Sequence, residues 1–303
     1  MKAVTFSEYG GPEVLRVADV DEPHAGPGQI RIAVRAAGVN PIDWKARTGM
    51  LREVVPLTFP AVDGREASGV VDEVGDGVTG VAPGDEVFGF TVGGAAAAYA
   101  VLDAFARKPA ALSFEEAAGF PVAVETSVRV FGVLGGVGEG QTLVINGAAG
   151  GVGVAAVQLA GVRGARVIGT ASERNHEFLR SLGAEPTTYG DGMVDRIRAL
   201  APEGVDLAFD TAGQGGVPDL IALTGDPARV ATIADFSAAA LGAKVSSGAD
   251  GRAVEALDEA AELAGAGRLT VPVERAFPFA EAGDAHRLSA EGHVRGKLVL
   301  VPG

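Results

Sequence analysis

The glycine-rich segment at residues 147–153, Gly-Ala-Ala-Gly-Gly-Val-Gly, most constrains how this chain of 303 residues can fold. It follows an apolar run at residues 142–145 and opens into a helix-like apolar pattern at residues 154–160. A strand that ends at glycines and turns directly into a helix points unpaired N–H groups and the positive helix end at one spot, where a pyrophosphate can bind. A second strand-like run at residues 165–170 completes a βαβ unit, so the segment predicts dinucleotide binding rather than a merely tight turn. The residues predicted to contact the cofactor here are Ala148, Gly150, Gly151, Val152 and Gly153.

A second glycine cluster, at residues 135–138, lacks this context. No strand leads straight into it, and a strand follows it. Glycine spacing alone is a weak signal, so we interpret this cluster as a turn.

The pattern of the chain changes after Leu112. Up to about residue 110, short alternating runs such as residues 29–37 are separated by glycine and proline turns, which indicates a β-rich, barrel-like unit. Ser113 with Glu116 forms the sequence pattern of a capping box and predicts a helix start. From Gln141 onward strands alternate with helices, which implies a doubly wound parallel sheet.

The sequence therefore predicts an α/β protein with two domains. The run at residues 269–273 and the terminal run at residues 297–301 are expected to return to the first domain. The predicted domains are residues 1–116 with 266–303, and residues 117–265.

Composition narrows the classes of partner and chemistry. A net charge of −14 without a basic stripe argues against nucleic acid, and no apolar run approaches the ~20 residues that span a bilayer. The first residues read as a strand without signal-peptide architecture, so we expect a cytoplasmic protein with no membrane partner. The absence of cysteine excludes disulfides, thiolate zinc sites and cysteine nucleophiles. The four histidines are scattered without metal-ligand spacing, so no metal site is predicted.

The residues at the end of the second strand of the βαβ unit help to distinguish an NAD site from an NADP site. An NAD site usually carries an acid there, whereas this chain has Ala171. Arg174 supplies a forked cationic donor, and Ser172 and Asn175 add neutral hydrogen bonds, which suits the 2′-phosphate of NADPH. The alternative is that Ser172 caps the next helix and Arg174 is solvated. Glu173 opposes the NADPH interpretation, because a carboxylate accepts from a ribose hydroxyl and repels phosphate.

Several segments carry a family resemblance through their order and spacing. They are Tyr-Gly-Gly-Pro-Glu-Val-Leu at residues 9–15, Gly-Val-Asn-Pro-Ile-Asp-Trp-Lys-Ala-Arg-Thr-Gly at 38–49, Gly-Asp-Gly-Val at 75–78, Pro-Gly-Asp-Glu-Val at 83–87, the glycines at 147–153 and Gly-Lys-Leu-Val-Leu at 296–300. Together they resemble the zinc-free quinone oxidoreductase (zeta-crystallin-like) branch of the medium-chain dehydrogenase/reductase superfamily.

The resemblance implies a GroES-like substrate domain built from both chain ends, with a Rossmann domain inserted between them. It also implies a homodimer and NADPH-dependent reduction of quinones or of carbon–carbon double bonds conjugated to a carbonyl. Zinc-dependent relatives carry a cysteine near the Asn40 segment, which this chain lacks. Ala98 stands where many relatives have a glutamate, and Trp44 and Lys45 replace an aromatic or hydroxyl residue, so quinone specificity stays open.

The catalytic hypothesis follows from hydride chemistry, in which the protein supplies position and electrostatics. Without a metal, a carbonyl must be polarised by hydrogen bonds or a cation, for which Asn40 and Lys45 are the candidates and Tyr99 a further one. Asn40 could instead be a turn residue, and Lys45 a solvated surface lysine. Asp43 is expected to fix the loop or to pair with Arg47.

The resemblance also suggests cofactor contacts away from the glycines. Tyr189 follows the third Rossmann strand, where such enzymes often place a tyrosine near the adenosine phosphates. Ala212 follows the fourth strand, and Ala234 and Phe236 follow the next, on the carboxyl edge where open α/β sheets bind ligands. Thr126 could equally be an ordinary helix residue, and Lys297 an ordinary strand-start lysine. A role limited to NADPH binding, as a redox-sensing or structural protein, is the alternative to an enzyme. The further cofactor candidates are Thr126, Tyr189, Ala212, Ala234, Phe236 and Lys297.

Overall fold

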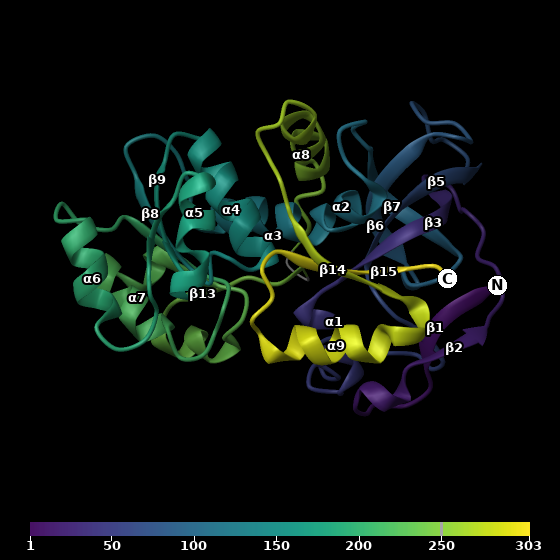
Figure 1. Ribbon diagram of the computed structural model, residues 1–303, viewed down its shortest axis with the longest axis horizontal. Coiled ribbons are helices and arrows are strands. Elements are labelled where there is room, and N and C mark those ends of the chain that lie inside the picture. The colour runs from purple at the N-terminus through teal and green to yellow at the C-terminus, as the bar shows by residue number, and fades with distance from the viewer. Residues whose placement is uncertain (249–250) are drawn as a thin grey trace. The chain divides into compact units, whose positions relative to one another are not determined.

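The computed structural model describes residues 1–248 and 251–303, and the chain forms two compact units (Figure 1). The first unit contains Met1–Val122, Leu257–Gly267 and Val271–Gly303, and the second contains Ala123–Ala256 and Arg268–Thr270. The domain limits expected from the sequence, at residues 116/117 and 265/266, stay a prediction. No helix in the described part of the chain is long and apolar enough to cross a membrane.

The larger sheet of the first unit contains a closed barrel. Its strands, in spatial order, are β14 (Val273–Pro278), β15 (Lys297–Val301), β3 (Ile30–Val39), β5 (Glu66–Val74), β6 (Glu86–Val92) and β7 (Tyr99–Arg107). Strand β7 also pairs with β3, so the sheet closes on itself and leaves no open edge there. Alternate residues of β3, including Ile30, Ile32 and Val34, are buried in the core of this unit. The prediction of a β-rich, barrel-like unit is confirmed.

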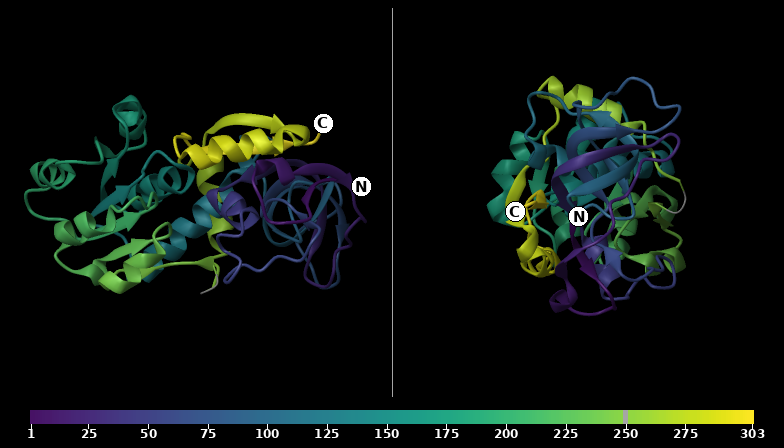
Figure 2. Two further views of the ribbon diagram at one scale, coloured as in Figure 1. Left: turned by 90° about the horizontal axis from the view of Figure 1, so that it is seen from below. Right: turned by 90° about the vertical axis from the view of Figure 1, so that its right-hand side faces the viewer.

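A small sheet and short helices complete the first unit. The small sheet consists of β1 (Lys2–Phe6) between β2 (Arg16–Asp19) and β4 (Ala61–Val62). The helices are η1 (Pro12–Val14), α1 (Pro41–Arg47), α2 (Phe114–Ala118), α8 (Ala256–Gly265), η6 (Phe279–Glu281) and α9 (Ala282–Glu291). Helix α9 crosses over between the parallel strands β14 and β15, lies beside them and contacts α1 (Figures 1 and 2).

The predicted capping box at Ser113 is present. The Ser113 hydroxyl accepts from the Glu116 amide at 3.1 Å, and the Glu116 carboxylate accepts from the Ser113 amide at 2.8 Å. The alternating pattern of residues 14–17 predicts a strand from residue 14, but η1 occupies Pro12–Val14 and the strand begins at Arg16.

The second unit is the doubly wound sheet that the alternation predicted. Its parallel strands are β8 (Thr142–Asn146), β9 (Arg166–Thr170), β10 (Glu185–Thr187), β11 (Leu207–Asp210), β12 (Val230–Thr232) and β13 (Lys244–Val245). Their spatial order, β10-β9-β8-β11-β12-β13, is the 3-2-1-4-5-6 order of a dinucleotide-binding fold. The order in which successive strands are added to the sheet reverses between β8 and β11, and β8 leads into the glycine turn.

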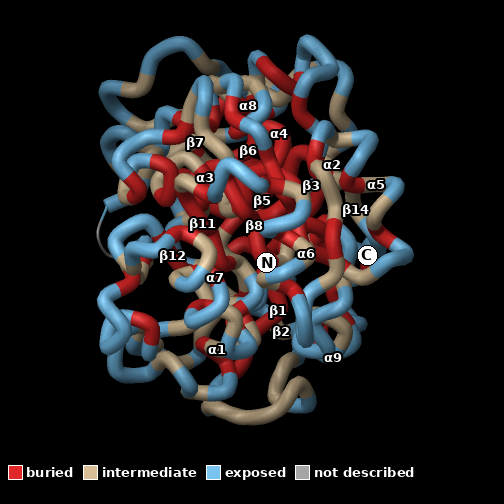
Figure 3. The backbone as a smooth tube through the Cα atoms, turned by 90° about the vertical axis from the view of Figure 1, so that its left-hand side faces the viewer, coloured by how far each residue is buried: buried red, intermediate tan, exposed pale blue. Residues whose placement is uncertain are grey.

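Helices cover both faces of that sheet. They are α3 (Phe120–Val133), α4 (Gly151–Val162), η2 (Glu173–Asn175), α5 (His176–Ser181), α6 (Met193–Leu200), α7 (Val217–Thr224), η3 (Pro227–Arg229) and η4 (Phe236–Leu241). Val144 and Ile168 pack with residues of α6 and α7 on one face, whereas α4 packs on β8 and β9 from the other (Figure 1). The strands are accordingly buried on both faces, and the connecting loops are exposed (Figure 3).

Candidate functional site

The glycine turn after β8 is shaped by backbone contacts that a side chain would prevent. Gly147 adopts a φ of +83°, and Gly150 stands at the start of α4. A Cβ atom on Gly153 would lie 2.4 Å from the carbonyl oxygen of Gly147, so α4 approaches the turn closely only because this residue is glycine. The last glycine of the motif therefore fixes the packing of helix against strand.

The start of α4 leaves backbone donors available. No residue in the described part of the chain accepts a hydrogen bond from the amides of Gly151, Val152 or Gly153, because they belong to the first helical turn. A Cβ on Gly150 would lie 3.5 Å from the Gly147 oxygen, an ordinary contact distance. Ala148 differs from its neighbours, since its amide already donates to Thr170 at 3.0 Å and its side chain is fully buried. The turn fits a pyrophosphate held by backbone amides.

Buried polar side chains join the ends of four neighbouring strands beside this turn. Asp210 accepts from the Asn146 amide group at 2.9 Å and from the Thr232 hydroxyl at 2.7 Å. The Thr170 hydroxyl donates to Asn146 at 2.7 Å and accepts from the Gly147 amide at 3.1 Å. The strand-end network of Asn146, Thr170, Asp210 and Thr232 therefore holds the carboxyl edge of the sheet, including the glycine turn, in one arrangement.

The same network holds two loops that the sequence singled out. The amide of Ala212 donates to Asp210 at 3.2 Å, and the amide of Ala234 donates to the Thr232 hydroxyl at 3.1 Å. Tyr189 follows β10 and Phe236 follows β12, and each keeps 51% of its surface exposed. The sequence analysis did not identify the network itself. The available signal was a polar residue at the end of each apolar strand.

The segment after β9 presents two charged side chains. Glu173 and Arg174 are exposed, whereas Asn175 is buried and donates to the Ser172 hydroxyl at 3.3 Å. The side chain of Ser172 makes no capping hydrogen bond to the helix that follows. The Ser172 side chain therefore does not cap the helix, and that alternative is wrong.

Thr126 lies in α3 within a buried ionic group. Its hydroxyl donates to Glu125 at 3.3 Å and accepts from Arg129 at 3.4 Å. Glu125 and Arg129 form an ion pair at 2.8 Å, and Glu125 also accepts from the amide of Ala253 at 3.1 Å. Thr126 is therefore held by two charged neighbours and is not an isolated helix residue.

The first unit brings Asn40 and Lys297 together. The Lys297 ammonium donates to the Asn40 side-chain oxygen at 2.5 Å and to Glu66 at 2.6 Å, and the Asn40 amide group donates to Glu66 at 2.7 Å. All three side chains are buried. A Cβ atom on Gly38 would meet the Glu66 carboxylate at 2.2 Å, which explains the glycine on β3. Sequence analysis missed Glu66, the carboxylate that neutralises Lys297.

The other two catalytic candidates lie elsewhere in this unit. Lys45 is half-buried on α1, with its ammonium 5.6 Å from the ring centre of Trp44, and burial lowers the pKa of Lys45. The guanidinium carbon of Arg31 lies 5.0 Å from the ring centre of Tyr99, and Tyr99 stands opposite Ala33 in the pairing of β7 with β3. Asn40 follows the far end of β3, roughly 20 Å away at ~3.3 Å per residue. The structure does not bring Tyr99 to Asn40.

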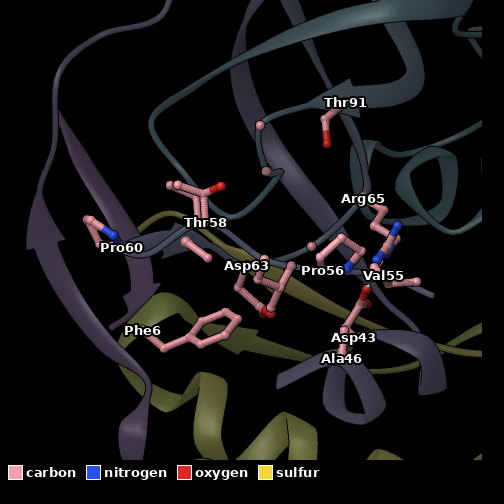
Figure 4. Close-up of a pocket in the computed structure, with 16 residues that line it drawn as sticks. Phe6, Asp43, Ala46, Val55, Pro56, Thr58, Pro60, Asp63, Arg65 and Thr91 are labelled. Carbon is pink, nitrogen blue, oxygen red and sulfur yellow. Dashed lines mark ion pairs between the residues drawn. The ribbon is translucent and has the colours of Figure 1, made fainter. Parts of the chain in front are cut away.

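A cavity of about 530 Å³ opens in the first unit, next to α1 (Figure 4). Its polar lining includes Asp43, Asp63, Arg65 and Thr91, and apolar residues such as Phe6 and Leu57 form other walls. We call this cavity the Arg65 pocket. The Asp43 side chain is 2% exposed, and its Oδ2 accepts from the Asn40 amide at 2.7 Å.

The other carboxylate oxygen of Asp43, Oδ1, accepts no hydrogen bond and faces the Arg65 Nε at 3.6 Å. Burial, with the nearby Asp63 carboxylate, raises the pKa of Asp43 to about 6, while Arg65 opposes the shift.

A buried ionic chain lies behind this pocket. His286 Nε2 contacts Asp63 at 2.9 Å, and Arg47 Nε donates to His286 Nδ1 at 3.2 Å. A neutral His286 with its proton on Nε2 satisfies both contacts. Burial lowers the pKa of His286, but the Asp63 carboxylate outweighs burial, and the net pKa is raised. Of the two roles expected for Asp43, it fixes the start of α1 through the Asn40 amide and does not pair with Arg47, which binds His286 and Gly10.

Comparison with known proteins identifies the family. Residues 26–140 match the alcohol dehydrogenase GroES-like domain, and residues 182–300 match the zinc-binding dehydrogenase family. This chain has no cysteine, and the described residues contain no group of three or more histidine or acidic side chains that could hold a metal ion.

Individual relatives and a solved structure agree with this assignment. The chain is 32% identical over 234 residues to a chloroplastic quinone-oxidoreductase homolog of Spinacia oleracea, covering 72% of this chain and 69% of that protein. It is 31% identical over 326 residues to a chloroplastic NADPH-dependent alkenal/one oxidoreductase of Arabidopsis thaliana, covering 100% of this chain and 80% of that protein. The quinone oxidoreductase of Coxiella burnetii has the same fold, with a TM-score of 0.85 at 32% identity, covering 100% of this chain and 99% of that one.

A further relative is much longer than this chain. A pikromycin polyketide synthase component of Streptomyces venezuelae is 40% identical over 210 residues, which covers 63% of this chain and 5% of that protein. The barrel unit, the 3-2-1-4-5-6 sheet and these relatives converge. The chain belongs to the zinc-free quinone oxidoreductase branch of the medium-chain dehydrogenase/reductase superfamily, and it is an oxidoreductase with a nicotinamide-dinucleotide-binding fold.

Proposed function

We propose that this protein is an NADPH-dependent reductase of α,β-unsaturated carbonyl compounds or quinones. The observation that carries the proposal is the glycine turn after β8, where free amides at the start of α4 stand beside the strand-end network. Bound NADPH would supply a hydride, so the chain itself must hold the cofactor, bind the carbonyl compound and stabilise negative charge on its oxygen.

NADPH is proposed over NADH from the segment after β9. Ala171 replaces the acid that an NAD site uses, and Arg174 is exposed close to the strand end. Ser172 does not cap the following helix, so its hydroxyl remains able to bind a phosphate oxygen. A relative named as an NADPH-dependent alkenal/one oxidoreductase supports the same choice.

The roles of the remaining cofactor candidates follow from their positions. Gly150, Gly151, Val152 and Gly153 would bind the pyrophosphate through the backbone, and Ala148 would support the turn from beneath. Tyr189 and Phe236 offer exposed rings at the carboxyl edge, and the loops of Ala212 and Ala234 are held there by the network. Thr126 would offer a hydroxyl whose position Glu125 and Arg129 fix.

The catalytic candidates are constrained by their partners. Both polar atoms of the Asn40 side chain already bind Lys297 or Glu66, which leaves Asn40 one N–H to offer a substrate. Lys297 uses two of its three N–H donors in the same cluster, so we propose that it positions Asn40. Lys45 keeps a half-buried ammonium with a lowered pKa, which suits stabilisation of a developing enolate. Tyr99 is assigned no such contact, because it lies at the other end of β3.

Steady-state NADPH oxidation with a panel of quinones and enones tests the proposal. We expect turnover with at least one class and formation of the saturated ketone from an enone. A protein that binds NADPH tightly but turns over none of the panel would favour the alternative, a binding or redox-sensing role. A homodimer is also proposed from the family resemblance, and a cytoplasmic location from the sequence pattern; sedimentation velocity and cell fractionation would test them.

A further inference from the structure

The cation of the Arg65 pocket has unused hydrogen-bonding capacity. Arg65 precedes β5, its backbone oxygen accepts from the Thr91 amide at 2.9 Å, and its side chain is 39% exposed. Its charged partner among the described residues is Asp43, through Nε at 3.6 Å. A guanidinium carries five N–H donors, so the terminal amino groups are free to bind a ligand oxygen. Figure 4 shows the Arg65 and Asp43 side chains close together at the pocket wall.

Two buried oxygens of the same pocket lack hydrogen-bond partners. They are Oδ1 of Asp43 and Oγ1 of Thr91, and both residues line the cavity. A buried polar atom without a partner costs free energy, so native proteins seldom leave one unsatisfied unless water or a ligand completes it. The two atoms mark a polar corner of the cavity, which apolar residues such as Phe6 and Leu57 also line. The Thr91 hydroxyl can donate to the oxygen of a ligand, whereas the Asp43 oxygen can only accept and faces Arg65.

The charges around the polar corner select the kind of ligand. Asp43 and Asp63 line the pocket, and they are opposed by the guanidinium groups of Arg65 within it and of Arg47 behind it. An anionic ligand would approach two carboxylates as well as one guanidinium. A neutral carbonyl oxygen accepts hydrogen bonds from Arg65 without that repulsion, and a hydrocarbon tail suits Phe6, Val55 and Leu57.

We propose that the Arg65 pocket binds a neutral, largely apolar carbonyl compound, with Arg65 donating hydrogen bonds to its carbonyl oxygen. Asp43 is a positioning residue that orients the guanidinium, and the Thr91 hydroxyl is a second donor to the ligand. The inference rests on the proposed function and makes it more specific, because it adds Arg65 to Asn40 and Lys45 as a residue that binds the substrate oxygen.

The tryptophan next to Asp43 provides a direct test without turnover. Trp44 is the single tryptophan of the chain, so its fluorescence reports ligand binding beside this pocket. The full-length protein is titrated without cofactor, using 3-nonen-2-one as the probe and 3-nonene as its counterpart without oxygen. We expect the enone to bind more tightly by about tenfold or more, because a hydrogen bond from a charged donor contributes that much.

Three variants distinguish a loss of ligand recognition in the pocket from a general effect on the fold. Arg65→Met should remove the preference for the enone and leave the affinity for the alkene unchanged, and Arg65→Lys should retain part of the preference. Arg52→Met is the matched control, because Arg52 is exposed, pairs with Glu53 and does not line the pocket. Equal binding of enone and alkene by the wild-type protein, or a full enone preference in Arg65→Met, would overturn the proposal.

The outcome is separable from that of the proposed function. Turnover that does not depend on Arg65 contradicts the pocket assignment and leaves the reductase assignment standing. An Arg65-dependent preference for the enone in a protein that never oxidises NADPH supports the pocket and contradicts the reductase.

Discussion

The strand-end network of the second unit and the Arg65 pocket of the first unit both gather buried polar groups, but they differ in how those groups are satisfied. In the network, the Asn146 amide and the Thr232 hydroxyl both donate to Asp210. In the pocket, Asp43 and Thr91 each keep a buried oxygen without a hydrogen-bond partner. A satisfied network makes a rigid platform, whereas in the pocket the Thr91 hydroxyl still has a proton to donate to the oxygen of a ligand. Changes in the network should therefore lower stability, and changes in the pocket should mainly alter ligand affinity.

The largest effect is expected at the glycine turn that the network supports. Gly153→Ala places a Cβ 2.4 Å from the Gly147 oxygen, so α4 must move away from the turn. We expect a loss of about 3 kcal/mol in stability, at the upper end for overpacking, and a more than hundredfold weaker affinity for NADPH by calorimetry. Gly138→Ala in the other glycine cluster is the control, because its Cβ would have its nearest neighbour at an ordinary 3.6 Å. Wild-type NADPH affinity in Gly153→Ala would refute this account of the turn.

The network itself should respond in stability. Asp210→Asn replaces one acceptor oxygen by an NH₂ group that faces the Asn146 amide or the Thr232 hydroxyl, both of which are donors. The free energy of unfolding should fall by about 2 kcal/mol in urea titrations. Asp226→Asn should change little, because an exposed asparagine can still accept from the Ala228 amide. Equal stabilities for the two variants would show that the network is not the rigid element described above.

The pocket should respond to pH through Asp43. Its pKa in the folded protein, about 6, lies above the ordinary 3.8, so the folded state binds more protons between these values. This contribution stabilises the protein below about pH 4 and is lost as the pH rises through about 6. Wild-type stability should therefore fall relative to Asp43→Asn by on the order of 1–2 kcal/mol between pH 4 and pH 7.

The comparison with the variant isolates Asp43 from its neighbours. His286 also has a raised pKa, so its titration lowers stability as the pH rises, as that of Asp43 does. Because His286 is present in both the wild-type protein and the variant, its contribution cancels to first order in their stability difference. Asparagine retains an oxygen to accept from the Asn40 amide, so the start of α1 is preserved. A constant stability difference across this pH range would mean that Asp43 titrates normally.

The smallest effect concerns the choice of cofactor. Arg174→Ala should lower the preference for NADPH over NADH by about tenfold, the loss of one charge-assisted contact to the 2′-phosphate. Arg180→Ala, an exposed arginine in the last turn of α5, serves as the control. The ratio of the two dissociation constants provides the measurement, and an unchanged ratio would remove Arg174 from the cofactor site.

Most of the fold could be predicted from the sequence, because the patterns that indicate strands, turns and helix starts depend on neighbouring residues. Apolar strands such as residues 142–145, the glycine turn and the capping box at Ser113 depend on neighbours in the chain, and the structure confirms them. The very short strand β13 was not predicted, since two residues have no measurable periodicity. Helix α1 was missed because Pro41 suggested a turn, whereas proline is also favoured in the first turn of a helix.

The site was harder to predict because its key contacts join residues far apart in the chain. Lys297 reaches Asn40 and Glu66, and His286 reaches Asp63, across more than 200 positions. Arg65 carries no local signal beyond being a charged residue before a strand. A pattern names residue types that suit a chemistry, but only the fold determines which of them share a cavity.

Transfer of labelled hydride tests the central claim of a reductase most directly. NADPH deuterated at the transferable C4 position is incubated with the protein and 3-nonen-2-one, and the product is analysed by mass spectrometry and NMR. We predict 2-nonanone with one deuterium at the β-carbon, formed at the rate at which NADPH is consumed. Tight binding of NADPH without deuterium in any product of the enone and quinone panel would contradict it.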